Sequence, residues 1–290
     1  MMIIHTALVV IFALGLLAAP LAVEAQQAKK VPRIGVLTGP VDPGVEAFRE
    51  GLRELGYVER KNIAIEHRSA EGKLDRLPEL AAELVRLKVD VIVGSGNLTI
   101  AALKKATQTI PIVIAIAADP VGDGFVASLA RPGGNITGLT VIAEQLSRKR
   151  LELLKEINPR ITRVAVTRNP ITQTHVALWE ETQAAATALG IKVFPLDIRG
   201  PDDIESAVGT IAREHADALI VLPEPVSFTN RKRMVDLAAK TALPAMFPWK
   251  EFADSGGLMV YAPNRDDLWR RSATYVDKIL KGAKPADLPI

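Results

Sequence analysis

The chain contains 290 residues, and its 36 basic and 33 acidic side chains give a net charge of +3 at neutral pH. Because these charges are spread along the chain rather than gathered in one arm, the composition does not indicate nucleic-acid binding. Cysteine is absent, which excludes disulfides, thiolate nucleophiles, cysteine-ligated metal centres and lipid attachment to a cysteine.

The first 25 residues have the pattern of a secretory signal peptide. They are apolar from Ala7 to Ala19, and Val23-Glu24-Ala25 has the small-x-small form of a cleavage site. This apolar run is shorter than the roughly 20 residues that a membrane-spanning helix needs. We therefore expect export and cleavage after residue 25. The segment before the run has His5 where a Lys or Arg is usual, so a retained anchor is the alternative.

From residue 31, short runs rich in valine and isoleucine alternate with longer stretches whose apolar residues recur at helical spacing. Such alternation is typical of parallel strands joined by crossover helices. In the first half of the chain this pattern predicts strands at 33–37, 62–66, 89–93 and 111–117. It predicts helices at 45–55, 77–87 and 99–107. The strand runs are apolar throughout, so we expect helices on both faces of the sheet.

The same order of elements recurs in the second half. It predicts strands at 164–166, 192–198, 218–222 and 245–247. It predicts helices at 176–189, 203–215 and 231–241. The halves also resemble each other in detail, since Leu55-Gly56 and Leu189-Gly190 each end a helix just before a strand. The sequence therefore predicts an α/β protein of two similar Rossmann-like lobes, each with a parallel sheet.

Two glycine-marked turns mark the connections between these lobes, at 133–140 and at 256–261. The helix expected at 268–280 would return to the first lobe. We predict that lobe 1 consists of 31–138 and 264–290 and that lobe 2 consists of 139–263, after the signal peptide at 1–25. Lobes joined by more than one strand form a hinge that closes on a ligand.

Ligands of open parallel sheets bind at the carboxyl ends of the strands, where helix N-termini present unpaired N–H groups. The polar and aromatic residues that follow the expected strands are therefore the candidate ligand-binding residues. They are Ser95, Gly96, Asn97, Asp119, Asn169, Glu224 and Tyr261.

Each candidate has a role in binding and a structural alternative. Ser95 and Asn97 start a helix and either bind a carboxylate or only cap the helix. Asp119 and Glu224 follow strands of different lobes and could meet at a cationic group such as an α-ammonium, although Asp119 before a proline also fits a turn.

The remaining candidates also have two interpretations. Asn169 precedes a proline and fits either an Asx turn or a hydrogen bond to a ligand. Tyr261 and Trp249 either form walls of the binding site or are buried in the core.

Enzyme motifs are absent from the sequence. Ser95 does not lie in a G-x-S-x-G elbow, there is no phosphate-binding P-loop, and the pair Gly94-x-Gly96 lacks the third glycine of a dinucleotide fingerprint. The four histidines do not have metal-ligand spacing. We expect no catalytic residue, no metal and no cofactor.

Several longer runs together resemble one protein family over nearly the whole mature chain. They are Arg33–Leu37, Phe48–Tyr57, Asp119–Gly122, Leu129–Gly138, Lys149–Lys155 and Ala273–Gly282. These runs resemble the ABC transporter substrate-binding proteins, whose fold is that of the type I periplasmic binding proteins. Members usually continue for several tens of residues beyond Pro289, so we expect this chain to be shortened at its C-terminus.

The resemblance implies a non-catalytic periplasmic receptor that delivers a solute to an ABC transporter permease in the inner membrane. Some relatives are associated with aromatic amino acids, and the cleft loops of the family fall on the seven candidate residues. We therefore expect capture of a small organic molecule, with an amino acid among the candidates. A Rossmann-like enzyme acting on a small metabolite is the alternative. A regulator's sensing domain is a third class, against which the export signal argues.

Overall fold

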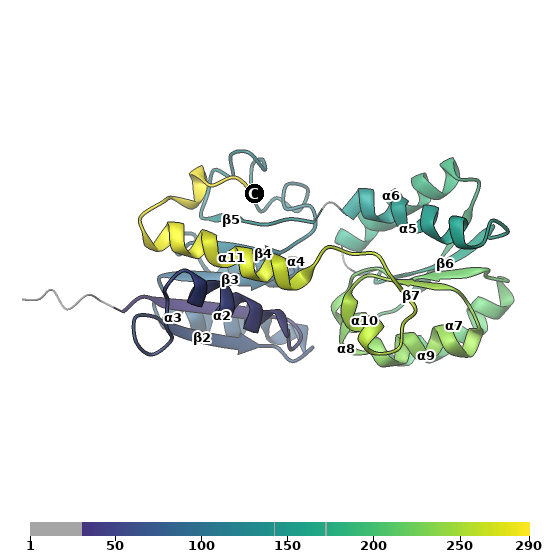
Figure 1. Cartoon of the computed structure of the whole chain (residues 1–290), viewed down its shortest axis with the longest axis horizontal. Coiled ribbons are helices and arrows are strands. Elements are labelled where there is room, and N and C mark those ends of the chain that lie inside the picture. Colours follow the sequence, from purple (N-terminus) through teal and green to yellow (C-terminus); the bar gives the residue numbers. More distant parts are fainter. Residues whose placement is uncertain (1–30, 142, 172) are drawn as a thin grey trace, which may run out of the picture.

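The computed structural model describes residues 31–141, 143–171 and 173–290, so the expected signal peptide lies outside the described residues. The described chain forms two α/β lobes, each built on a five-stranded parallel sheet (Figure 1). The predicted fold class is therefore confirmed. Among the described helices, none is both long enough and apolar enough to cross a membrane.

The sheet of lobe 1 contains the first five strands. In spatial order they are β2 (Ala64–Ser69), β1 (Arg33–Thr38), β3 (Val91–Ser95), β4 (Ile112–Ile116) and β5 (Ile136–Gly138). Every pairing is parallel. β5 ends at Gly138, where the backbone has φ +134° and an added Cβ would lie 2.2 Å from the Ile114 carbonyl oxygen. Only glycine lets β5 approach β4 this closely.

Helices cover both faces of this sheet. One face is covered by α2 (Gly44–Glu54) and α11 (Arg265–Leu280), and the other by α3 (Leu77–Arg86) and α4 (Asn97–Ala106). The buried strands are apolar because neither face meets water. Short 3₁₀ turns precede α3 and follow α11, at Leu74–Arg76 and Pro285–Asp287.

Lobe 2 repeats the arrangement. In spatial order its strands are β10 (Met259–Val260), β9 (Ala245–Phe247), β8 (Ala218–Ile220), β6 (Arg163–Arg168) and β7 (Lys192–Asp197), all parallel. One face is covered by α5 (Ala143–Ile157) and α6 (Gln173–Ala188), the other by α7 (Pro201–Arg213) and α9 (Arg231–Thr241). Two five-residue helices, α8 (Pro225–Thr229) and α10 (Lys250–Asp254), follow β8 and β9.

The described chain passes between the two sheets at two places. The first crossing leads from β5 to α5, and the second leads from β10 to α11, drawn in yellow in Figure 1. α11 then packs along α2 in lobe 1, where the rings of Phe48 and Trp269 lie 6.2 Å apart. The residue boundaries that we assigned to the lobes stay a prediction.

Candidate ligand-binding site

The two lobes enclose a cavity at the carboxyl ends of both sheets, which we call the interlobe cavity. Its volume of about 130 Å³ is about ten times the space that one water molecule needs. Most of the lining comes from segments that follow β1, β3 and β4 in lobe 1 and β8 and β9 in lobe 2, and single residues after β2, β5, β6 and β10 complete it. The lining residues are Gly39, Pro40, Asp42, Leu74, Ser95–Thr99, Ile116–Ala118, Val141, Leu178, Pro223–Pro225, Phe228, Trp249 and Arg265.

The first turn of α4 forms one wall of the interlobe cavity. Ser95 ends β3 and is buried, and Gly96 turns the chain with φ +93° while its N–H donates to the Ile116 carbonyl at 2.8 Å. α4 begins at Asn97, and no described side chain caps it. The N–H groups of a first helical turn have no partner within the helix and lie at the positive end of its dipole. This wall is suited to a carboxylate.

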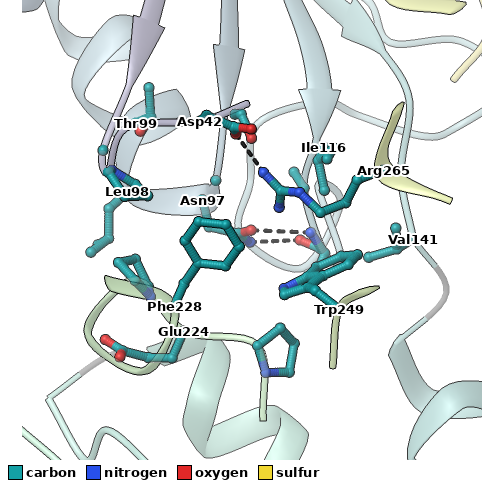
Figure 2. A pocket seen from close by; sticks show the side chains of 18 of the residues that line it. Asp42, Asn97, Leu98, Thr99, Ile116, Val141, Glu224, Phe228, Trp249 and Arg265 are labelled. Carbon is teal, nitrogen blue, oxygen red and sulfur yellow. Dashed lines mark hydrogen bonds and ion pairs between the residues drawn. The ribbon is translucent and has the colours of Figure 1, made fainter. Parts of the chain in front are cut away.

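The Asn97 side chain lines the cavity, but its hydrogen bonds are made within lobe 1. Its Nδ2 donates to the Ala118 carbonyl at 2.6 Å and to the carboxylate of Asp123, and its Oδ1 accepts the Ala118 N–H at 3.0 Å. Figure 2 shows the two bonds to Ala118 as dashed lines. Asn97 therefore ties α4 to the loop that follows β4.

Asp119 lies on that loop but outside the described lining of the cavity. Asp119 is exposed, and its carboxylate accepts the Gly122 N–H at 2.8 Å. The backbone of Asp119 has φ +37°, a region that aspartate tolerates better than most residues. This arrangement corresponds to the turn alternative for Asp119, and the meeting of Asp119 with Glu224 at one cationic group stays a prediction.

Glu224 is one of two buried carboxylates that line the interlobe cavity, and Asp42 is the other. Glu224 precedes α8 and is 5% exposed, with Oε2 accepting the Ser227 N–H at 3.0 Å and Oε1 accepting Nδ2 of Asn169 at 3.1 Å. Burial raises the pKa of Glu224, and these hydrogen bonds only partly offset the effect. Asn169 does not line the cavity; besides donating to Glu224, it accepts the Ile171 N–H through its Oδ1 at 3.3 Å, which corresponds to the Asx-turn alternative.

Tyr261 belongs to the second crossing rather than to the cavity wall. Its side chain is 38% exposed, and its carbonyl accepts Nε of the buried Arg150 at 3.0 Å. Burial lowers the pKa of Arg150 to about 10. Trp249, in contrast, does line the cavity. Ser95, Gly96, Asn97 and Glu224 thus lie together at the cavity, whereas Asp119, Asn169 and Tyr261 lie around it, and ligand binding by all seven stays a prediction.

Sequence reasoning missed three prominent lining residues, Asp42, Phe228 and Arg265. The Arg265 guanidinium lies 5.0 Å from the ring centres of both Phe228 and Trp249 and forms ion pairs with Asp42 and Glu251. Figure 2 shows Arg265 between Asp42 and the two rings. The sequence carries no motif for this arrangement, because it depends on how lobe 1 meets lobe 2.

The described residues contain no group of three or more histidine, aspartate or glutamate side chains placed to hold a metal ion. The polar groups at the cavity are instead a helix N-terminus, a buried carboxylate and a paired guanidinium. These groups can bind the charged ends of a small molecule through hydrogen bonds.

Two solved structures and one curated relative are similar to most of the chain. A conserved domain protein from Vibrio cholerae O1 biovar El Tor has a TM-score of 0.84 and 29% identity over 90% of this chain and 88% of that one. The ABC domain in complex with L-Trp from Streptococcus pneumoniae has a TM-score of 0.82 and 26% identity, covering 89% and 88%. A tyrosine-binding protein of Clostridioides difficile (strain R20291) is 24% identical over 268 residues, 91% of this chain and 76% of that protein.

A family model covers almost the whole described chain. The model for ABC transporter substrate binding proteins matches residues 36–290, which include all of both sheets except the start of β1, both crossings and the interlobe cavity. The family is one of substrate-binding proteins. The chain belongs to the ABC transporter substrate-binding protein family.

Proposed function

We propose that this protein captures an amino acid with an apolar or aromatic side chain in the interlobe cavity and delivers it to an ABC transporter permease for import. The observation that carries the proposal is the pairing of two charge-binding groups across one cavity. Lobe 1 presents the uncapped first turn of α4, and lobe 2 presents the buried carboxylate of Glu224.

These two groups match the two charged ends of an α-amino acid. The N–H groups at the start of α4 would receive the carboxylate, as helix N-termini bind anions. Glu224 would receive the ammonium group, because a carboxylate oxygen that already accepts one hydrogen bond retains further acceptor capacity. A ligand ammonium would also provide the positive charge that a buried carboxylate otherwise lacks.

The remaining walls are suited to an apolar side chain. They are formed by Leu74, Leu98, Ile116, Val141, Leu178, Phe228 and Trp249. Burying an apolar side chain here would add roughly 1.5–3 kcal/mol to binding. The names of two relatives, a tyrosine-binding protein and a domain solved with L-Trp, support an aromatic side chain.

Closure of the lobes would complete the site. Either lobe alone offers only one of the two charge-binding groups, so the ligand binds more tightly to the closed form and shifts the protein towards it. The closed form would then dock on the permease in the inner membrane, with the protein in the periplasm and no reaction catalysed. The signal-peptide pattern at 1–25 supports this location.

Thermal unfolding in the presence of many small molecules tests the proposal. The purified protein is heated with a panel of amino acids, purines, sugars, organic acids and nucleotides. A ligand that binds the folded state stabilises it by about 2.7 kcal/mol at 100 times its Kd. We expect a selective rise in melting temperature with one or a few apolar or aromatic amino acids. A rise with another class of compound and none with amino acids would contradict the proposal.

A further inference from the structure

A buried charged contact joins the lobes at the hinge end of the interlobe cavity. It is centred on Arg265, the first residue of α11, whose side chain is 11% exposed. α11 packs along α2 and so belongs to lobe 1. The guanidinium, however, reaches side chains of both lobes, and no described residue beyond these side chains contributes to its charge pairing.

On the lobe 1 side the guanidinium is held firmly by Asp42. The Asp42 side chain is 2% exposed, its Oδ2 accepts from an Nη of Arg265, and its Oδ1 accepts the Gly44 N–H at 3.0 Å. A charge-assisted hydrogen bond of this kind is stronger than a neutral one. Arg265 is therefore oriented by its own lobe before it meets the other.

On the lobe 2 side the guanidinium enters a slot formed by three residues: Phe228 of α8, Trp249 before α10 and Glu251 of α10. Its carbon lies 5.0 Å from both ring centres, and Nε lies 3.1 Å from Oε1 of Glu251. Phe252 packs behind Phe228 and stacks on Phe247 at 5.3 Å. The slot is thus fixed in shape by the core of lobe 2, and its rings and carboxylate both favour a planar cation.

The contacts of Arg265 with the two lobes differ in their hydrogen bonding. Arg265 and Asp42 share a hydrogen bond, whereas Arg265 Nε and Glu251 Oε2 are buried atoms without a hydrogen-bond partner among the described residues. The approach of Arg265 to Glu251 is therefore an ion pair without an aligned hydrogen bond. When the lobes part, the contact with Glu251 and the rings is the one expected to separate.

We infer that Arg265 acts as a latch between the lobes and stabilises the closed form before any ligand is bound. Its guanidinium is held on lobe 1 by Asp42 and inserts into the slot of lobe 2 formed by Phe228, Trp249 and Glu251. This inference rests on the proposed function, because closure matters through ligand capture. The latch sets how much of the closing free energy the ligand itself must supply. The Arg265 guanidinium also covers one face of the Phe228 ring and one face of the Trp249 ring. A ligand ring would therefore pack on other parts of the cavity wall.

The distance between the lobes in the absence of ligand tests the latch directly. Because the chain has no cysteine, spin labels can be placed at Glu79→Cys in α3 and Glu205→Cys in α7, both exposed. The protein is unfolded, dialysed and refolded to remove any co-purified ligand, and the label distance is measured by double electron–electron resonance. We expect a short-distance, closed population in the otherwise unchanged protein.

Glu251→Gln is the informative variant, since Glu251 is absent from the cavity lining and the Arg265–Asp42 pair is retained. It should lower the ratio of closed to open protein about ten-fold, as expected for loss of a partly buried charged partner. Asp254→Asn is the matched control. Asp254 lies on the same helix and its substitution removes the same charge, but among the described residues its ion pair is with exposed Lys250, at 2.8 Å. The control should leave the distances unchanged.

A second variant, Arg265→Lys, keeps the positive charge towards Asp42 but loses the planar group that fits between the rings. It should also shift the distances towards the open form, and it replaces Glu251→Gln if that variant does not unfold cooperatively. The inference would be overturned if the variant and the control gave the same label distances. It would also be overturned if the protein without these substitutions were entirely open. Because no ligand is present, these outcomes are independent of whether an amino acid binds.

Discussion

Glu224 is the residue whose environment bears most directly on function. Its carboxylate is buried at the interlobe cavity beside an amide and a backbone N–H, with no cationic side chain among its hydrogen-bond partners in the described part of the chain. Burial raises its pKa. The group is therefore destabilised in its charged form until a cation arrives, which is the property expected of an ammonium-binding site.

The raised pKa of Glu224 predicts a pH dependence of stability. The folded protein holds this proton more tightly than the unfolded chain, so the contribution of Glu224 is fully present below its ordinary pKa of about 4.3 and is lost as pH rises through the raised value. Glu224→Gln should remove this part of the pH dependence. Denaturant unfolding of both proteins between pH 4 and pH 8 measures it. Parallel stability curves for the two proteins would contradict the assignment.

Asn97 gives a second prediction at the level of a single residue. Its side chain makes three hydrogen bonds that tie α4 to the loop following β4. Asn97→Ala should lower the free energy of unfolding by about 1–3 kcal/mol, because the partly buried partners lose their hydrogen bonds. Lys105→Ala, at an exposed position of the same helix, should change it by less than about 0.5 kcal/mol. Equal effects in urea unfolding would show that Asn97 is not a tether.

Individual cavity-lining residues were predictable where they follow strands. The strand-end rule found Ser95, Gly96, Asn97 and Glu224, all of which line the interlobe cavity. It could not tell that Asp119 forms a turn hydrogen bond with Gly122. It could not find Arg265 either, because that residue starts a helix of one lobe and meets its ring partners only across the interface.

At the level of elements, most of the fold was predictable from periodicity. The eight expected strands occur in the structure, with ends that differ by up to three residues, because apolar runs in a doubly covered sheet leave a clear pattern. The short helices α8 and α10 were missed, since five residues span little more than one helical turn. α4 starts two residues earlier than expected, because Gly96 rather than a capping side chain precedes it.

The contact between α2 and α11 depends on two glycines of α2: Gly44, which lies against Trp269, and Gly51. A Cβ at Gly51 would lie 2.5 Å from the Arg270 carbonyl oxygen and 3.0 Å from Cβ of Ala273. Gly51→Ala should therefore push α11 away from α2 and lower stability by about 1–3 kcal/mol, despite the better helix propensity of alanine.

Gly209→Ala is the control for this prediction. Gly209 lies within α7, and an added Cβ there would meet no atom within 4 Å. The substitution should raise stability by about 0.4–1 kcal/mol through the unfolded chain. Thermal unfolding of the two variants compares them directly. A Gly51→Ala protein as stable as the Gly209→Ala protein would mean that the helices have room to adjust.

For the whole molecule, the sequence predicted two lobes but not how they meet. Residue periodicity is a local property, whereas the interlobe cavity and the contacts of Arg265 arise from the relative placement of the two sheets. That placement brings the start of α4 and Glu224 to opposite walls of one cavity. Recognition of both charged ends of one small molecule is the central claim that follows.

Isothermal titration calorimetry with three related compounds tests this claim most directly: L-tryptophan, tryptamine without the carboxylate, and indole-3-propionate without the ammonium group. We predict one-to-one binding of L-tryptophan, or of the amino acid that thermal unfolding selects. We expect affinity at least about ten-fold weaker for each compound that lacks one charged end, since each loss leaves a cavity group unpaired. Binding of either truncated compound as tightly as the parent amino acid would contradict a site built for both ends.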